Sequence, residues 1–103
     1  MYAGFCARCH SADGAGVRDH GPALAGNSVV LAADPTSAIR IVVEGARPAP
    51  GTHGPVQRMP AMRGALTSSE IAAVVSYVRG AWENRAAPVS EQDVRRLRAA
   101  IHH

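Results

Sequence analysis

Residues 6–10 read Cys-Ala-Arg-Cys-His, and this stretch decides how the rest of the chain is interpreted. Cys6, Cys9 and His10 are spaced i, i+3 and i+4, so in a helix their side chains share one face. Cys6 and Cys9 are the only 2 cysteines among the 103 residues. The two thiols and the imidazole therefore form one candidate site for a common partner.

The Cys-x-x-Cys-His spacing is the attachment signature of c-type haem. In this interpretation the thiols of Cys6 and Cys9 bond to the two haem vinyl groups, and His10 reaches the iron. Three alternatives stay open at this point. A redox disulfide would be expected in a βαβ context, a structural zinc site needs four ligands, and the spacing can arise by chance. Neither His20 nor His53 supplies the second ligand pair that zinc would need.

The amino-acid composition indicates one domain, residues 1–103, with a thin core. A chain of this length is too short for two independently folded domains, and such a domain buries only about 65% of its unfolded surface. Hydrophobic residues make up 47% of the chain, but aromatic residues only 4%. A haem would therefore fill core volume that aromatic side chains fill elsewhere.

Charge and hydropathy argue against two classes of partner. The formal net charge is +3, all 11 basic residues are arginine, and the densest cluster is Arg95, Arg96 and Arg98. This basic footprint is too small to indicate nucleic-acid binding. No apolar stretch approaches the roughly 20 residues that span a bilayer, and no signal peptide is visible. His102 and His103 resemble the remnant of a purification tag, so we assign them no role.

About four short helices and no strand pair are predicted, which places the chain in the all-α class. The first helix covers residues 1–10, and the glycine-punctuated residues 11–33 are interpreted as a loop. Asp34 as N-cap with Pro35 at the first position begins the second helix, which stops at Gly45.

The third helix has the strongest signal. Thr67 and Glu70 match a capping box, and Leu66 with Ile71 matches a hydrophobic staple. Its apolar residues recur along one stripe: Ile71, Val74, Val75, Val78 and Trp82.

The last predicted helix repeats this pattern. Ser90 and Asp93 match a second capping box, and Val89 with Val94 matches a second staple. Val94, Leu97 and Ile101 form its apolar face.

The irregular residues 46–65 form a loop of unusual length for a compact domain, and such loops are more often functional than idle. The loop contains Met59, which precedes Pro60 and is therefore biased towards an extended backbone. A thioether presented from such a loop suits haem iron. From the residues alone, a core-filling role for Met59 is an equal alternative.

Several segments together resemble a class I mono-haem cytochrome c over nearly the whole chain. They are CARCH at 6–10, SADGAG at 11–16, GPALAG at 21–26, MP at 59–60 and LTSSEIAAVVSYVR at 66–79. More narrowly, residues 24–50 and 77–98 are similar to the cytochrome domains in multi-haem subunits of bacterial membrane-bound alcohol and sugar dehydrogenases.

This resemblance implies a cytochrome c fold wrapped around one covalently bound haem c. Cys6 and Cys9 would hold the haem, and His10 would be the proximal iron ligand. The carbonyl of Pro22 would accept the ring N–H of His10, a contact that fixes the tautomer and ligand strength of a histidine. Leu24 would pack on the haem ring.

The resemblance also implies Met59 as the distal ligand. From the residues alone, the other candidate side chains are His20, His53 and Met62. The implied function is electron transfer without catalysis, in the periplasm. The expected partners are redox proteins: a dehydrogenase catalytic subunit, a terminal oxidase or another cytochrome. The alternative function is a haem sensor or peroxidase-like protein whose sixth iron position is open.

The chain departs from the family pattern in two places. Only five residues precede Cys6, so we expect an excised or truncated domain of a larger subunit, because these cytochromes usually carry a longer first helix. The lysine ring that guides docking in mitochondrial-type cytochromes is absent. Arg40, Arg47 and Arg58 are candidates for neutralising the haem propionates, with solvated surface charge as the equal alternative.

Overall fold

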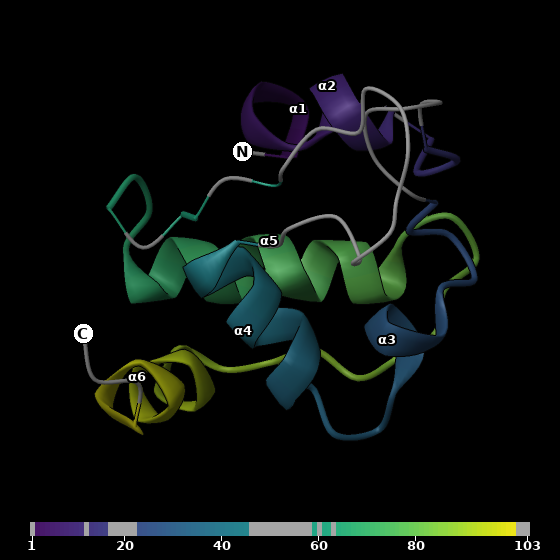
Figure 1. The fold of residues 1–103 in the computed structure, drawn as a ribbon. Helices are drawn as coiled ribbons and strands as arrows, with labels where there is room; N and C mark the ends of the chain where they lie inside the picture. Colours follow the sequence, from purple (N-terminus) through teal and green to yellow (C-terminus); the bar gives the residue numbers. More distant parts are fainter. Residues whose placement is uncertain are drawn as a thin grey trace, which may run out of the picture.

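The computed structural model describes residues 2–11, 13–16, 23–45, 59, 61–62 and 64–100. The described residues form six helices and no strand (Figure 1), which confirms the predicted all-α class. The helices are α1 (Tyr2–Phe5), α2 (Ala7–His10), α3 (Ser28–Leu31), α4 (Thr36–Glu44), α5 (Ser68–Gly80) and α6 (Glu91–Ala100).

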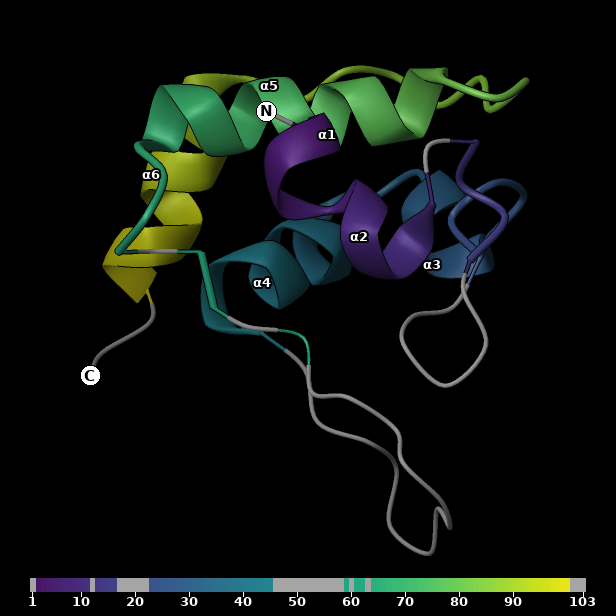
Figure 2. The same ribbon diagram turned by 90° about the horizontal axis from the view of Figure 1, so that it is seen from above.

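Helix α5 is the centre of the arrangement and packs against α3, α4 and α6. Figure 1 shows α1 and α2 above α5, with α6 below it. Seen from above in Figure 2, α1 and α2 lie between α5 and α4. The helix pair that carries the candidate haem-binding residues is therefore on the opposite side of α5 from α6.

The predicted capping box begins α5. The Glu70 N–H donates to Thr67 Oγ1 over 3.1 Å, and the Thr67 N–H donates to Glu70 Oε1 over 2.9 Å. The predicted stripe is buried at Ile71, Val74 and Val75, which are 0%, 3% and 3% exposed. The prediction that the stripe continues to Trp82 is wrong, because α5 stops at Gly80 and Trp82 follows the helix with a φ of 50°.

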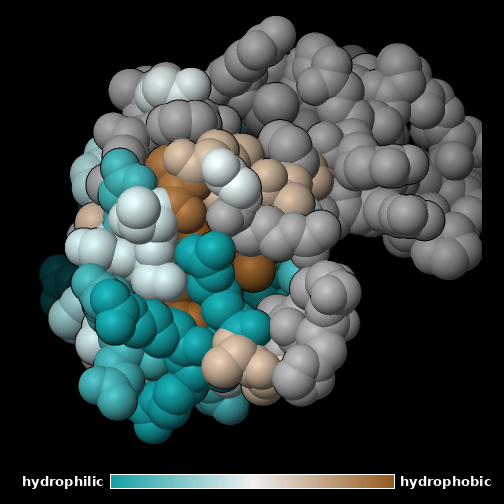
Figure 3. Space-filling model, turned by 90° about the vertical axis from the view of Figure 1, so that its left-hand side faces the viewer, coloured by the Kyte–Doolittle hydropathy of each residue, from teal (hydrophilic) through white to brown (hydrophobic). Residues whose placement is uncertain are grey.

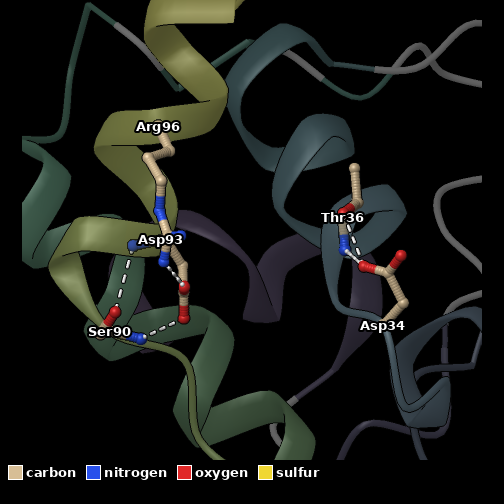
Figure 4. A network of polar contacts seen from close by, with 5 residues as sticks. All are labelled: Asp34, Thr36, Ser90, Asp93 and Arg96. Carbon is tan, nitrogen blue, oxygen red and sulfur yellow. Dashed lines mark hydrogen bonds and ion pairs between the residues drawn. The ribbon is translucent and has the colours of Figure 1, made fainter.

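Polar contacts confirm the predicted start of α6, whereas the predicted N-cap of α4 at Asp34 is wrong by one residue (Figure 4). The Asp93 N–H donates to Ser90 Oγ, and the Ser90 N–H donates back to Asp93 Oδ2. At α4, Asp34 Oδ1 accepts both the N–H and the hydroxyl of Thr36. Helix α4 begins at Thr36, so Pro35 occupies the cap position and not the first helical position.

The sequence missed α3, which lies within residues predicted to be loop. Asn27 starts this single turn, since its side-chain oxygen accepts the N–H groups of Val29 and Val30. Val30 is 7% exposed. A four-residue turn is too short to show a helical repeat of apolar residues, and a side-chain cap of this kind also occurs in non-helical turns.

The surface near α6 is hydrophilic. In Figure 3 the coloured residues of the lower part of this face are mostly teal to white, and brown appears only in small separate areas. Arg95 pairs with Glu91, and Arg96 lies 2.9 Å from Asp93. Two arginines of the densest basic cluster are thus partly neutralised. No helix among the described residues is long and apolar enough to cross a membrane.

Candidate haem attachment site

The Cys-x-x-Cys-His stretch follows one nearly continuous helical path. Cys6 lies between α1 and α2 with φ −114° and ψ −37°, and His10 is the last residue of α2. The His10 N–H donates to the Cys6 carbonyl over 3.0 Å, the i to i−4 bond of an α-helix. Cys6 is half-buried against the core and His10 is only 6% exposed. The Cys9 backbone lies in α2, and its side chain is outside the described set.

The chain turns sharply after His10. Ser11 ends the helix at φ 63°, and Gly14 and Gly16 have φ values of 69° and 87° that favour glycine. Asp13 stabilises this turn by accepting the Ala15 N–H over 3.0 Å. The Ser11 hydroxyl and then the Ala15 N–H lower the pKa of the Asp13 carboxyl below its usual range. The Gly16 N–H donates back to the His10 carbonyl over 2.9 Å, which closes the turn.

Leu24 is brought next to this turn. The N–H groups of Leu24 and Ala25 both donate to the Gly14 carbonyl, over 2.7 Å and 3.0 Å. Leu24 is half-buried and packs against the hydrophobic core. Pro22, predicted to contact the His10 ring, lies outside the described residues.

The two candidate methionines differ in their surroundings. Met62 is 7% exposed within the core cluster, and its N–H donates to the Val42 carbonyl of α4 over 2.9 Å. Met59 is half-buried. The other two candidate ligands, His20 and His53, lie outside the described residues.

One of the three arginines proposed for the propionates is described. Arg40 is exposed on α4 and pairs with Glu44 one turn later, at 3.3 Å between Nε and Oε2. Its charge is thus partly compensated from within its own helix. Arg47 and Arg58 lie outside the described residues.

Aromatic side chains cluster beside the Cys-x-x-Cys-His helix. Tyr2, Tyr77 and Trp82 form a trio with ring centroids 5.1–5.7 Å apart. The Tyr2 hydroxyl donates to the Ser11 carbonyl over 2.6 Å. Burial, followed by the nearby Cys6 thiol, raises the pKa of Tyr2 to about 12. Tyr2 therefore stays neutral at physiological pH and anchors α1 to the residue that follows His10.

The sequence did not predict the roles of two buried polar residues. Arg79 is 2% exposed and Asn84 is 5% exposed. Arg79 bonds to the carbonyls of Val30, Ala32 and Ala87 at 2.6–3.1 Å. The sequence did contain one signal for Arg79. It lies four residues after Val75, on the apolar face of α5, where an arginine is either buried or interrupts that face.

The donor set fits a c-type haem. A helical run presents a half-buried thiol and a buried imidazole one turn apart, and the second cysteine of the motif belongs to the same helix α2. A methionine thioether from the loop before α5 is half-buried and available as a further soft donor. Two thiols and an imidazole are the groups that attach and ligate a c-type haem, and a thioether is one ligand that the second axial position can take.

Comparison with known proteins gives the same result. The cytochrome c family model matches residues 1–82. Over 100 residues the chain is 40% identical to the cytochrome c subunit of a quinone alcohol dehydrogenase from Gluconobacter oxydans (strain 621H), which covers 95% of this chain and 21% of that protein.

Two further relatives extend the comparison. The chain is 37% identical over 102 residues to the gluconate 2-dehydrogenase cytochrome c subunit of Pantoea cypripedii, covering 95% of this chain and 23% of that protein. It is 30% identical over 103 residues to the fructose dehydrogenase cytochrome subunit of Gluconobacter japonicus, covering 96% and 21%. The chain thus spans about a fifth of the length of these relatives.

These matches confirm the resemblance at both levels, to cytochrome c and to the cytochrome subunits of dehydrogenases. Membership of this family implies a covalently bound haem c. Because the family model covers residues 1–82, including the whole Cys-x-x-Cys-His helix and the Met-Pro pair, this chain belongs to the cytochrome c family.

Proposed function

We propose that this domain carries one electron at a time on a single haem c that is attached through Cys6 and Cys9. The observation that carries the proposal is the buried His10, whose N–H donates to the carbonyl of Cys6 one helical turn earlier. When bound, the haem supplies a ferrous/ferric couple whose potential the protein adjusts through its ligands and their surroundings.

The residues of the chain hold and shield this group. His10 is the proximal ligand, and its burial keeps bulk water from the imidazole. We infer that the Pro22 carbonyl accepts the ring N–H of His10 and that Leu24 covers the haem ring. The packing of Leu24 against the core supports its role.

We infer Met59 as the distal ligand. The side chain of Met62 already packs in the hydrophobic core, and its backbone is bonded to α4. Met59 is only half-buried, so its side chain can turn towards the haem iron without leaving a cavity in the core. His/Met ligation gives a higher reduction potential than His/His ligation, which suits an acceptor of electrons from a dehydrogenase.

The proposed partners are a dehydrogenase catalytic subunit as donor, and a terminal oxidase or another cytochrome as acceptor. The printed names of the relatives support the donor, since they are cytochrome subunits of alcohol, gluconate and fructose dehydrogenases. The proposed location is the periplasm, because covalent haem attachment of this type takes place outside the cytoplasm.

The test is the visible spectrum of protein from a bacterial strain with cytochrome c maturation. Sharp α and β bands in the reduced state, together with haem that acid acetone does not extract, support the proposal. Ready binding of carbon monoxide would instead indicate an open sixth position and a sensor or peroxidase-like protein. A colourless protein would contradict both.

A further inference from the structure

The residues that follow α5 reach towards the glycine-rich turn near His10. Asn84 is 5% exposed and makes three side-chain hydrogen bonds. Its Oδ1 accepts the Gly26 N–H over 2.9 Å, and its Nδ2 donates to the Leu24 carbonyl over 3.2 Å. Nδ2 also donates to the Val78 carbonyl of α5 over 2.8 Å. One amide therefore ties residues 24–26 to the end of the central helix.

The same segment is connected to the proximal histidine. The Gly14 carbonyl accepts the N–H groups of Leu24 and Ala25, and the Gly16 N–H donates to the His10 carbonyl. A continuous set of hydrogen bonds thus runs from Asn84 through residues 24–25 and the 14–16 turn to the end of α2. Such a connection can transmit the position of one end to the other.

Trp82 makes a second contact from the same short segment. A Cβ placed on Gly14 would lie 2.5–2.7 Å from the Trp82 ring carbons, so the ring rests directly on this glycine. Trp82 and Glu83 have φ values of 50° and 69°, which are unfavourable for residues other than glycine. Strained backbone of this kind persists where the surrounding structure fixes it, and it concentrates at functional sites.

We propose that Asn84 is a positioning residue for the proximal side of the haem, a role that rests on the proposed function. It fixes the segment that carries Leu24 and follows Pro22, and so sets how that segment lies against His10. Partners that surround a metal-bound histidine set its orientation and its strength as a ligand. Removal of the three Asn84 hydrogen bonds, which we call the Asn84 clamp, should therefore change the reduction potential as well as the stability.

The experiment compares two substitutions that leave the net charge unchanged, both in the haem-loaded protein. Asn84→Leu keeps the size of the side chain but removes all three hydrogen bonds. The matched control is Ser76→Ala, since the Ser76 hydroxyl donates to the Val89 carbonyl over 3.0 Å and accepts the Val89 N–H over 2.9 Å. These bonds join α5 to the segment before α6, on the other side of the central helix from α1 and α2 (Figure 1). The measurements are the reduction potential, the thermal midpoint and amide hydrogen exchange.

Both variants should lower the thermal midpoint, but only Asn84→Leu should shift the reduction potential beyond the error of the measurement. The amides of Leu24, Ala25 and Gly26 should exchange faster in Asn84→Leu, and that of Val89 faster in Ser76→Ala. An unchanged potential in Asn84→Leu, or an equal shift in Ser76→Ala, would overturn the proposal.

A milder substitution covers the case in which Asn84→Leu does not load haem. Asn84→Ser keeps a small polar side chain and should give a smaller shift of the reduction potential in haem-loaded protein, and no shift would count against the clamp. A wild-type protein that lacks haem would refute the proposed function itself, a result distinct from a haem protein whose potential ignores Asn84.

Discussion

Two regions of the molecule are held together by different forces. The aliphatic half, α4 to α6, packs side chains such as Ile39, Ile71 and Val94 that are 0–2% exposed. On the haem side, residues 2–11, 13–16 and 23–26, only a few side chains such as Tyr2 and Leu24 pack on that core, and backbone hydrogen bonds and the amide of Asn84 join the rest. The first region thus supplies most of the apolar core, whereas the second adds few side chains to that core and depends more on hydrogen bonds.

The largest expected effect comes from removing the covalent attachment. Cys6→Ala combined with Cys9→Ala should leave haem extractable by acid acetone and much of the chain unfolded, because the thin core loses its filler. Amide exchange should rise on the haem side before it rises in α5. Full helical content and an unchanged thermal midpoint without haem would contradict the difference between the two regions.

A cavity in the aliphatic half should lower the stability of the protein but leave the haem and its reduction potential unchanged. Ile71 is fully buried, so Ile71→Ala should cost about 2–5 kcal/mol of unfolding free energy, measured by denaturant titration. We expect the reduction potential of the remaining folded protein to stay close to that of the wild type. A large potential shift would show that the two regions are coupled more tightly than their contacts indicate.

The turn after His10 can be broken by one methyl group. Gly14→Ala places a Cβ against the Trp82 ring at a φ of 69°, and the left-handed backbone alone costs about 1–2 kcal/mol. The control is Gly4→Ala in α1, where nothing lies within 4 Å of the added Cβ. Gly4→Ala should be neutral or stabilising, by up to about 1 kcal/mol. Thermal melts of both variants give the difference, and equal midpoints would contradict it.

The start of α5 offers a smaller test in the aliphatic half. Thr67→Ala removes one side of the capping box and should cost about 1 kcal/mol. Ser69→Ala, at an exposed position two residues later, should change stability little. Chemical denaturation measures both, and similar losses would show that the cap adds nothing.

The smallest expected effect is on acid stability. The Ser90 N–H and hydroxyl lower the pKa of Asp93 below its usual value of 3.8. A carboxyl whose pKa is lower in the folded state adds stability above its unfolded pKa and loses it as pH falls through the folded pKa. The wild type should therefore lose slightly more stability below about pH 4 than Asp93→Asn does. Parallel pH dependence of the two proteins would argue against this contribution.

The sequence predicted features that depend on neighbouring residues. The capping boxes of α5 and α6 and the helical path from Cys6 to His10 all follow from spacings of three or four residues. The haem-binding assignment rests on the same kind of local pattern, and the bond from the His10 N–H to the Cys6 carbonyl agrees with the predicted helical path.

Features that depend on distant partners could not be predicted in this way. Trp82 continues the spacing of the α5 stripe, but the chain leaves the helix to place its ring on Gly14. Asn84 is buried among hydrogen-bond partners, and two of these lie about 60 residues earlier in the chain. A buried polar side chain is stable only when such partners are supplied by the fold, and a single sequence does not record them.

The buried Arg79 has a consequence for the order in which the parts of the molecule unfold in acid. Its guanidinium joins α5 to the carbonyls that end α3 and to the segment before α6. Its three partners are backbone carbonyls, and backbone carbonyls do not titrate. This junction therefore keeps its bonding while the carboxylates at the starts of α4 and α6 are protonated. Helix ends should fray first, and the three segments that meet at Arg79 should form the most acid-resistant part of the molecule.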